Sequence, residues 1–330
     1  MPKFICAKHA LFGKIPAAGL LVLAVFFCSS VLAVPSEYEE EASSSTACLN
    51  EYAKLQDAYH NINGKLTIVS SDGSGMAPYL LVHARRGDNT YSFWEHLNGE
   101  IRGYALRNGH GFDFNQVRQV VDNLNWHPTL VWDRLLDKRT SFKDYVCVFT
   151  GRSRLAGHKV SLLRLAPQDG LRYSYLIAKD DDTSLPVEIS VLEPQGGIVA
   201  KLLALELELI NEMKFPVQEE LFERFEAQES ASTLDSSMIW PNLTIPKPFE
   251  LIARGVMPGS APTPEFLEFS DGLSSFRVYR AEKTSVMYPA LNNGTITILR
   301  KPTAQAEYAV VGEVPLRLAE LVLSKIPASR

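Results

Sequence analysis

One segment near the middle of the chain, residues 151–186, constrains the fold more than any other. It carries two stretches of alternating apolar and polar residues, separated by Pro-Gln-Asp-Gly. Pro167 presets φ, the Asp169 side chain can accept a hydrogen bond from the backbone that follows it, and Gly170 adopts positive φ without strain. This pattern predicts an antiparallel β-hairpin. Its strands span residues 158–166 and 171–178.

The alternation continues on both sides of this hairpin. Towards the C-terminus, residues 187–192, a turn at 193–197 and residues 205–209 extend an antiparallel meander with one apolar and one wet face. Towards the N-terminus, Asn98-Gly99 and Asn108-Gly109 are each typical of a two-residue hairpin turn. The strands predicted there span residues 62–70, 78–84, 91–97, 101–106 and 110–114. Periodicity alone therefore predicts a curved antiparallel sheet.

Two helices are predicted beside this sheet, because apolar residues recur at spacings of three and four. The first helix carries a single apolar stripe, made of Cys48, Tyr52, Leu55 and Tyr59. We expect this stripe to lie across the sheet. The second is a short helix over residues 117–124, which interrupts the run of strands.

The length of the chain indicates two domains, because roughly 300 residues exceed one ordinary core. Residues 216–237 are first highly charged, with room for a helical turn, and then small and polar, which is typical of a linker. The first domain is accordingly predicted at residues 47–215 and the second at residues 238–330. The second is predicted to be a compact α+β module whose C-terminal helix begins near Pro315. Its strands are predicted at residues 265–270, 275–281, 294–300 and 307–312.

Residues 1–33 predict a signal peptide. Three lysines precede an apolar run over residues 15–27, and Ala33 provides the small residue that a signal peptidase needs. A membrane anchor is the alternative, but the run is shorter than the ~20 residues that a bilayer-spanning helix requires. A lipid anchor at Cys28 is disfavoured because Phe27 stands where a lipoprotein signal requires a small residue. The mature chain is expected to begin with an acidic, disordered leader. This leader spans residues 34–46.

Removal of the signal peptide takes away three lysines and no acidic residues, so the formal net charge changes from −5 to −8. An acidic exported chain without a stripe of Lys and Arg is a poor partner for nucleic acid. Cys48 and Cys147 remain as an even pair, which in an oxidising compartment allows a disulfide between the first helix and a strand. Two separate buried thiols are an equal alternative, because sequence does not reveal whether the Cα atoms come within ~4.4 to 6.8 Å.

Three blocks of sequence are informative when they are taken together. The first combines Gly-Arg-Ser-Arg-Leu-Ala-Gly at 151–157, Pro-Gln-Asp-Gly-Leu-Arg-Tyr-Ser-Tyr at 167–175 and Asp-x-x-Thr-x-Leu-Pro at 180–186. The second is Phe-Ser-Asp-Gly-Leu-Ser-Ser-Phe at 269–276, and the third is Val-Val-Gly-Glu-Val-Pro at 310–315. Each block alone is a strand and a turn. In their common order and spacing, the three blocks resemble the RseB/MucB family of periplasmic regulators.

The resemblance implies both a fold and a function. The fold class is α+β and mainly antiparallel β: the N-terminal domain is an incomplete, strongly curved β-barrel like that of periplasmic lipoprotein carriers, closed by helices around a cavity. The function is negative regulation of the sigma-E (AlgU-type) envelope stress response in the periplasm. Such a protein binds the periplasmic segment of an RseA/MucA-type anti-sigma factor, shields it from proteolysis, and is released by lipopolysaccharide or acylated lipoprotein. A periplasmic lipid or lipoprotein carrier is the alternative, although a second domain has no place in a carrier. A homo-oligomer is left open.

No motif in the sequence indicates an enzyme: there is no P-loop, no GxSxG elbow and no HExxH helix. His110 with Asp113, and His96 with Glu100, have the spacing of metal ligands on a helix, but they lie in predicted hairpins. Residues 180–182 are three consecutive aspartates without the alternating ligands of a calcium loop. We therefore expect no catalytic residue, metal or cofactor, and a hydrolase is the least favoured class.

Aromatic residues crowd the sheet region of the first domain. A curved sheet that does not close leaves an apolar concavity that can bind an acyl chain. The alternative interpretation is that these aromatic side chains only fill the hydrophobic core. The candidates for a lipid cavity are Trp94, Phe112 and Trp126. In the second domain, the planar guanidinium of Arg can bind carboxylates of a partner, and Tyr adds rigid contact area. The alternative interpretation is that these residues lie on a strand face exposed to solvent. The candidate partner contacts are Arg277, Tyr279 and Arg280.

Overall fold

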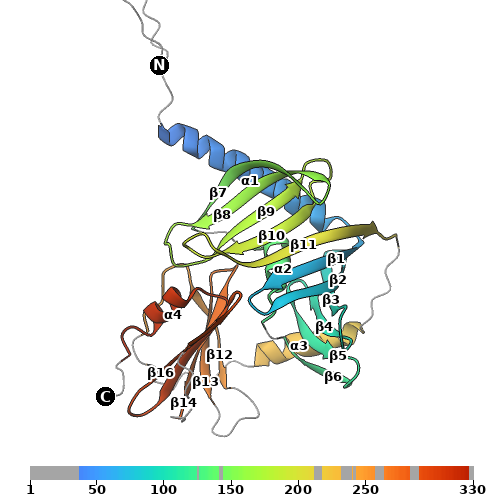
Figure 1. Ribbon diagram of the computed structural model, residues 1–330. Helices are drawn as coiled ribbons and strands as arrows, with labels where there is room; N and C mark the ends of the chain where they lie inside the picture. Colours follow the sequence, from blue (N-terminus) through green and yellow to red (C-terminus); the bar gives the residue numbers. More distant parts are fainter. Residues whose placement is uncertain are drawn as a thin grey trace, which may run out of the picture.

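Two antiparallel sheets and four helices make up the described part of this protein, for which the structure is a computed structural model (Figure 1). The structure describes residues 37–124, 126–140, 144–211, 218–231, 240, 243–256, 264–282 and 290–326. The helices are α1 (Glu37–His60), α2 (Leu130–Leu136), α3 (Glu219–Ala231) and α4 (Leu316–Val322). The strands of the first sheet are β1 (Gly64–Asp72), β2 (Gly75–Arg86), β3 (Asn89–His96), β4 (Arg102–Arg107), β5 (His110–Asn115), β6 (Val120–Asn123), β7 (Tyr145–Leu155), β8 (His158–Pro167), β9 (Ser174–Asp180), β10 (Pro186–Leu192) and β11 (Ile198–Leu209). The strands of the second are β12 (Glu250–Val256), β13 (Glu265–Ser270), β14 (Ser275–Ala281), β15 (Ala290–Asn293), β16 (Ile296–Pro302) and β17 (Glu307–Gly312).

The first sheet is one continuous meander in the order β6-β5-β4-β3-β2-β1-β11-β10-β9-β8-β7. Its two halves are joined where β1 pairs with β11 in antiparallel register. The edge strands β6 and β7 do not pair with each other, so the sheet curves without closing into a barrel. The predicted fold class, an incomplete antiparallel barrel followed by a smaller α+β domain, is confirmed.

The central hairpin forms as its turn chemistry predicts. Gly170 has a φ of +65°, and the Asp169 carboxylate accepts a hydrogen bond of 2.8 Å from the backbone N–H of Leu171. Strands β8 and β9 then pair in antiparallel register. The Asn108-Gly109 turn is also confirmed, with both residues at positive φ, 57° and 84°.

Two local predictions were wrong. The Asn98-Gly99 connection is a five-residue loop, because β3 ends at His96 and β4 begins at Arg102. Residues 117–124, predicted as a helix, contain strand β6, which pairs with β5. The reason is that a local turn precedes the strand: the Asn115 side chain accepts a hydrogen bond of 3.0 Å from the backbone N–H of Arg118, and β5 then offers an open edge.

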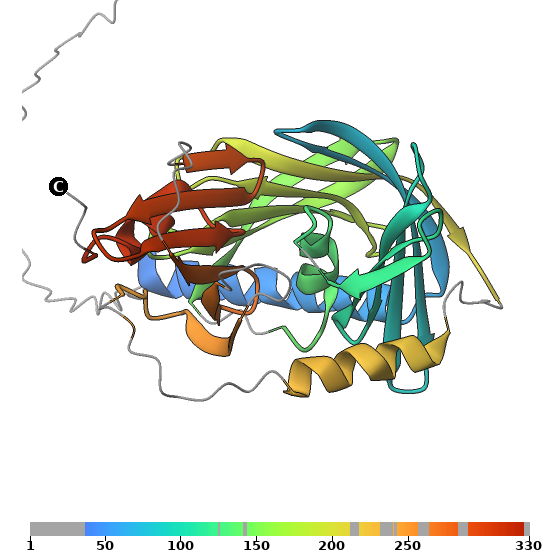
Figure 2. The ribbon, with the colours of Figure 1, turned by 90° about the horizontal axis from the view of Figure 1, so that it is seen from below.

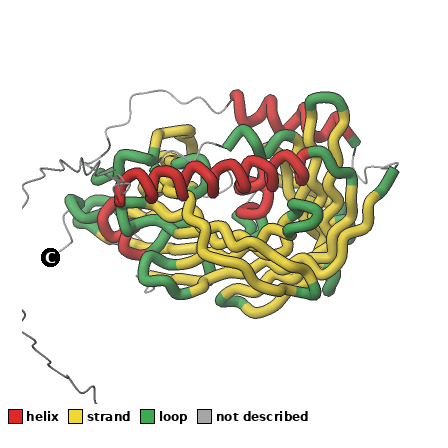
Figure 3. Tube along the Cα trace, turned by 90° about the horizontal axis from the view of Figure 1, so that it is seen from above, coloured by secondary structure: helices red, strands yellow, loops and turns green. Residues whose placement is uncertain are grey.

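Helices α1 and α2 fill the concave side of the first sheet. The buried stripe of α1 is the predicted one, and it faces Trp132 and Leu135 of α2 within the main core. Tyr52 donates its hydroxyl hydrogen to the carbonyl of Leu135, and Gln56 donates to the same carbonyl at 3.1 Å. Figure 2 shows α2, in green, within the curve of the sheet, and Figure 3 shows α1 crossing the strands.

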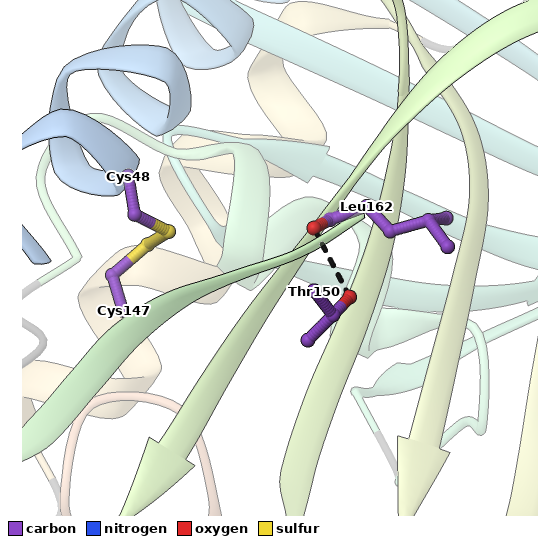
Figure 4. Close-up of a disulfide and its surroundings, with 4 residues drawn as sticks. All are labelled: Cys48, Cys147, Thr150 and Leu162. Atoms are coloured by element: carbon purple, nitrogen blue, oxygen red, sulfur yellow. Dashed lines mark hydrogen bonds between the residues drawn. A yellow bond between two sulfur atoms is a disulfide. The ribbon is translucent and has the colours of Figure 1, made fainter. Parts of the chain in front are cut away.

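A disulfide joins α1 to strand β7 (Figure 4). Cys48 and Cys147 have Cα atoms 5.6 Å apart and are separated by 99 positions in the sequence. Of the two alternatives that the sequence left open, the structure has the disulfide. Beyond the bond, β7 is bulged between Phe149 and Gly151, and the Thr150 hydroxyl donates to the carbonyl of Leu162 at 3.1 Å.

The N-terminal helix is longer than the sequence predicts. It begins at Glu37, so most of the segment expected to be a disordered leader, residues 34–46, is helical. Glutamate has a high helix propensity, and this Glu-rich composition accounts for the extension. The predicted signal peptide, residues 1–33, lies outside the described residues.

Helix α3 occupies the segment predicted as a linker, residues 216–237, in which the sequence suggested no more than a helical turn. Phe222 and Phe225 are 2% and 4% exposed, and both rings pack on Phe112, with centroids 5.1 and 5.2 Å away. These two rings form a narrow apolar stripe on a charged helix, which is enough to dock it on the outer face of β3–β5. Figure 2 shows α3, in gold, outside the curve of the sheet.

The second domain is a six-stranded antiparallel sheet in the order β12-β13-β14-β17-β16-β15. Helix α4 covers one face and begins directly after Pro315, as predicted. The core between them includes Phe276, Val278, Val310, Leu318 and Val322. The opposite face of the sheet carries the side chains of Phe266, Glu268, Arg277 and Tyr279 and is turned towards the first domain.

Replacing both Cys48 and Cys147 by Ser should lower the free energy of unfolding by about 2–5 kcal/mol, because the bond closes a long loop of the unfolded chain. Guanidinium denaturation with and without reductant measures the effect. Reductant should shift the wild-type midpoint towards that of the double variant and leave the variant unchanged. A wild-type midpoint that does not move on full reduction would contradict this role.

Candidate functional site

The loop between β13 and β14, residues 270–275, connects the second domain to the first. Gly272, with a φ of +95°, allows the tight reversal that presents the loop. Leu273 is 2% exposed and belongs to the core of the first domain rather than to that of its own. The second domain therefore contributes a side chain to the interior of the open barrel.

Asp271 anchors this loop. One carboxylate oxygen accepts hydrogen bonds from Arg172 at 2.9 Å and from the Tyr145 hydroxyl at 3.1 Å. The other oxygen accepts from the backbone N–H groups of Leu273 and Ser274, at 3.0 and 2.7 Å. The side chains of Arg172 and Asp271 are 1% and 0% exposed, so the ion pair between the domains is fully buried.

Further contacts surround this ion pair. Arg134 of α2 donates to the carbonyl of Leu273 at 3.1 Å and forms an ion pair with Glu313 of the second domain. The hydroxyls of Tyr175 and Ser274 lie 2.9 Å apart. Two more hydrogen bonds cross the interface, from Tyr173 to the carbonyl of Thr295 at 3.2 Å and from the Trp126 indole to Ser275 at 3.1 Å.

A cleft of about 930 Å³ lies beside the loop, between the two domains. The first domain contributes Trp126 and Arg134, and the second contributes the sheet face that carries Phe266, Arg277 and Tyr279. The Arg277 guanidinium lies 5.2 Å from the Trp126 ring and 4.7 Å from the Phe266 ring. Arg277 also pairs with Glu268 at 2.8 Å, so its charge is held in a fixed position beside two aromatic faces.

The cleft brings together two of the three predicted partner contacts. Arg277 and Tyr279 alternate along β14 and both line the cleft. Arg280 points to the opposite face of the strand, where it lies 3.6 Å from Glu265. Arg280 therefore does not line this cleft, since adjacent residues of a strand point to opposite faces.

The three predicted lipid-cavity residues lie in three separate places. Trp94 is fully buried inside the barrel and donates to Asp133 at 2.8 Å. Phe112 is fully buried on the outer face under α3, and Trp126 lines the cleft between the domains. The expectation of one cavity shared by these rings is therefore corrected: the first two point to opposite faces of the sheet, and the third belongs to the interface.

The sequence did not single out a polar group in the interior, Asp133 of α2. Burial raises the pKa of the Asp133 carboxyl to about 7, although hydrogen bonds from Ser92 and Trp94 act to lower it. A cavity of about 550 Å³ between α2 and the sheet is lined by Asp133, His83 and Gly272 of the loop. Burial lowers the pKa of His83 to about 3, so this imidazole is neutral. Asp133 and His83 belong to no recognisable sequence motif, so the sequence does not predict their burial.

The metal-like spacings of the sequence do not become metal sites in the described ranges. No group of three or more His, Cys, Asp and Glu side chains gathers there in a way that could hold a metal ion. Asp180, the first of the three consecutive aspartates, accepts from the backbone N–H groups of Asp182 and Thr183 and so caps its own turn. None of the helices in the described residues has the length and apolar character needed to cross a bilayer.

Comparison with known proteins assigns the family. The family model of the MucB/RseB N-terminal domain matches residues 49–225, and that of the MucB/RseB C-terminal domain matches residues 235–327. The chain belongs to the MucB/RseB family. The N-terminal match extends through half of α3, in agreement with the packing of this helix on the first domain.

Relatives in this family are distant in sequence and similar in length. The sigma-E factor regulatory protein RseB of Salmonella typhimurium is 24% identical over 326 residues, which cover 92% of this chain and 97% of the relative. The sigma factor AlgU regulatory protein MucB of Pseudomonas aeruginosa is 28% identical over 188 residues, 53% of this chain and 58% of the relative. The solved structure of MucB in complex with MucA(peri) superposes with a TM-score of 0.60 and 19% identity, covering 84% of this chain and 96% of that chain. This structural likeness supports the shared fold.

The raised pKa of Asp133 predicts a pH effect on stability. Its folded-state pKa of about 7 lies above the ~3.9 of an unfolded Asp, so protonation favours the folded state. The resulting stabilisation is complete below about pH 4 and is lost as the pH rises through about 7. Relative to Asp133→Asn, the wild type should lose at most about 1.4 kcal/mol per pH unit over this range. Urea denaturation of both proteins at several pH values measures the difference, and parallel stability curves would contradict the assignment.

Proposed function

We propose that this chain is a periplasmic regulator that binds the periplasmic segment of a membrane anti-sigma factor in the cleft between its two domains. Two findings support the proposal: membership of the MucB/RseB family, and the solved complex of a family member, MucB, with MucA(peri). Bound in this way, the protein shields the segment from proteolysis. Lipopolysaccharide or an acylated lipoprotein acts as the signal that ends the protection.

The observation that carries this proposal is the chemistry of the cleft. Trp126, Phe266 and Tyr279 give it rigid aromatic walls, and the Arg277 guanidinium lies within cation–π distance of the Trp126 and Phe266 rings. Aromatic and Arg side chains in a concave site are the residues that dominate protein–protein binding energy. With about 930 Å³ the cleft has room for several side chains of a bound peptide segment.

The alternative function, a lipid or lipoprotein carrier, is less well supported. A carrier needs its concave interior open to the acyl chain, whereas in this chain α1, α2 and Leu273 of the second domain occupy part of that interior. The buried ion pair between Arg172 and Asp271 also connects the barrel to a second domain. These features favour a regulator in which the two domains act together.

Replacing Tyr279 with Ala should weaken binding of a synthetic anti-sigma periplasmic segment by about 10- to 100-fold, because the variant removes a rigid wall of the cleft. Arg280→Ala is the matched control: this neighbouring residue points away from the cleft, and its loss should change the affinity by less than about twofold. Calorimetric titration of the segment into each variant measures both. Equal losses in the two variants, or none in Tyr279→Ala, would place the binding site elsewhere.

A further inference from the structure

The loop at residues 270–275 presents one anionic and one apolar side chain to the first domain, as a small amphiphile would. Asp271 supplies an anionic group, and Leu273 supplies an apolar group two residues away. Each is received by a matching part of the first domain: the carboxylate by Arg172 and Tyr145, and the isobutyl group by the core of the open barrel. The loop of the second domain thus occupies a binding site of the first domain in the way that a ligand would.

The first domain builds this receiving site from its own residues. Arg172 is held by the Asp169 carboxylate at 2.5 Å and by the carbonyl of Asp144 at 3.0 Å, and its guanidinium stacks 4.4 Å from the ring of Tyr145. All three supports lie in the first domain, so they keep Arg172 in place when the loop leaves. We name the pair of donors, Arg172 and Tyr145, the Arg172 site.

We propose that the Arg172 site binds an anionic amphiphile, and that this ligand competes with the loop. The phosphate or carboxylate head of the lipid takes the place of the Asp271 carboxylate. Its alkyl chain enters where Leu273 lies and continues into the cavity of about 550 Å³ that Gly272 of the loop lines. The inference rests on the proposed function, to which it adds the place and the mechanism by which a lipid signal acts.

Loss of the loop from the Arg172 site changes the cleft directly. Ser270 and Ser275, at the two ends of the loop, both line the cleft, and Ser275 accepts the hydrogen bond of the Trp126 indole. Arg134, which donates to the carbonyl of Leu273, lines it as well. A lipid that displaces the loop therefore alters one wall of the partner site, and by reciprocity a bound partner that requires the closed loop weakens lipid binding by the same factor.

Four probes separate the head from the chain: laurate and dodecyl phosphate carry both, dodecanol carries the chain alone, and inorganic phosphate carries the anion alone. Binding to the mature full-length protein is measured by calorimetry below the micelle concentration of each probe. Laurate and dodecyl phosphate should bind at least about fivefold more tightly than dodecanol, and phosphate alone should not bind measurably. Equal affinities for laurate and dodecanol would overturn the proposal.

Two variants break the same ion pair and are expected to act in opposite directions. Asp271→Asn weakens the competing loop and should raise the affinity for laurate by about fivefold or more, whereas Arg172→Gln removes the anion donor and should lower it by a similar factor. A merely structural role of the pair would move both affinities in the same direction. Leu291→Ala, an exposed leucine on β15, is the control and should leave laurate binding unchanged.

Hydrogen exchange tests loop release without any variant. The backbone N–H groups of Leu273 and Ser274 are bonded to Asp271 in the closed loop, and they should exchange faster when laurate is bound. Laurate binding with unchanged exchange in this loop would overturn the competition. Binding of the anti-sigma segment to the lipid-free protein is measured separately, so a failure of the proposed function is distinguished from a failure of the Arg172 site.

Discussion

The ion pair between Arg172 and Asp271 is the interaction on which the two-domain structure depends. A buried ion pair adds little net stability compared with an apolar pair of the same size, but removal of one partner costs about 3–5 kcal/mol because the other charge stays buried. Both side chains here are almost completely excluded from solvent. The pair therefore fixes which loop enters the barrel and in which orientation, while Leu273 supplies the apolar contact. Figure 1 shows the consequence, a second domain set against one end of the first.

The strands of the first domain could be predicted from sequence because their turns are encoded locally, as Asp169 and Gly170 illustrate. What could not be predicted was the pairing register of β3 with β4, which the loop at residues 97–101 connects. A two-residue turn at Asn98-Gly99 would place Trp94 and Phe112 on the same face of the sheet. The five-residue loop shifts the register by one, so Trp94 pairs with Tyr104 while Ala105 pairs with Phe112. A shift of one residue moves every side chain of a strand to the other face. The prediction that Trp94 and Phe112 line one cavity was wrong for this reason.

The functional site was only partly predictable for a related reason. Alternation along β14 is a local property, and it could have separated Arg280 from Arg277 and Tyr279. The contacts of the loop at residues 270–275 are not local, because Asp271 meets Arg172 across 99 positions and Leu273 enters the core of another domain. Helix α3 is a similar case, because its charged sequence resembles a linker. Only the packing of Phe222 and Phe225 on the first sheet docks this helix on the first domain. Family resemblance located the loop as a motif, but not its partners.

The central claim is that the loop couples the two domains into one cooperative unit, and thermal unfolding followed by differential scanning calorimetry tests it most directly. The wild-type protein should unfold in a single transition whose calorimetric and van't Hoff enthalpies agree. The double variant Asp271→Asn/Leu273→Ala should unfold in two transitions, one for each domain, because the loop no longer joins their cores. Two separate transitions in the wild type, or a single one retained in the double variant, would contradict the account.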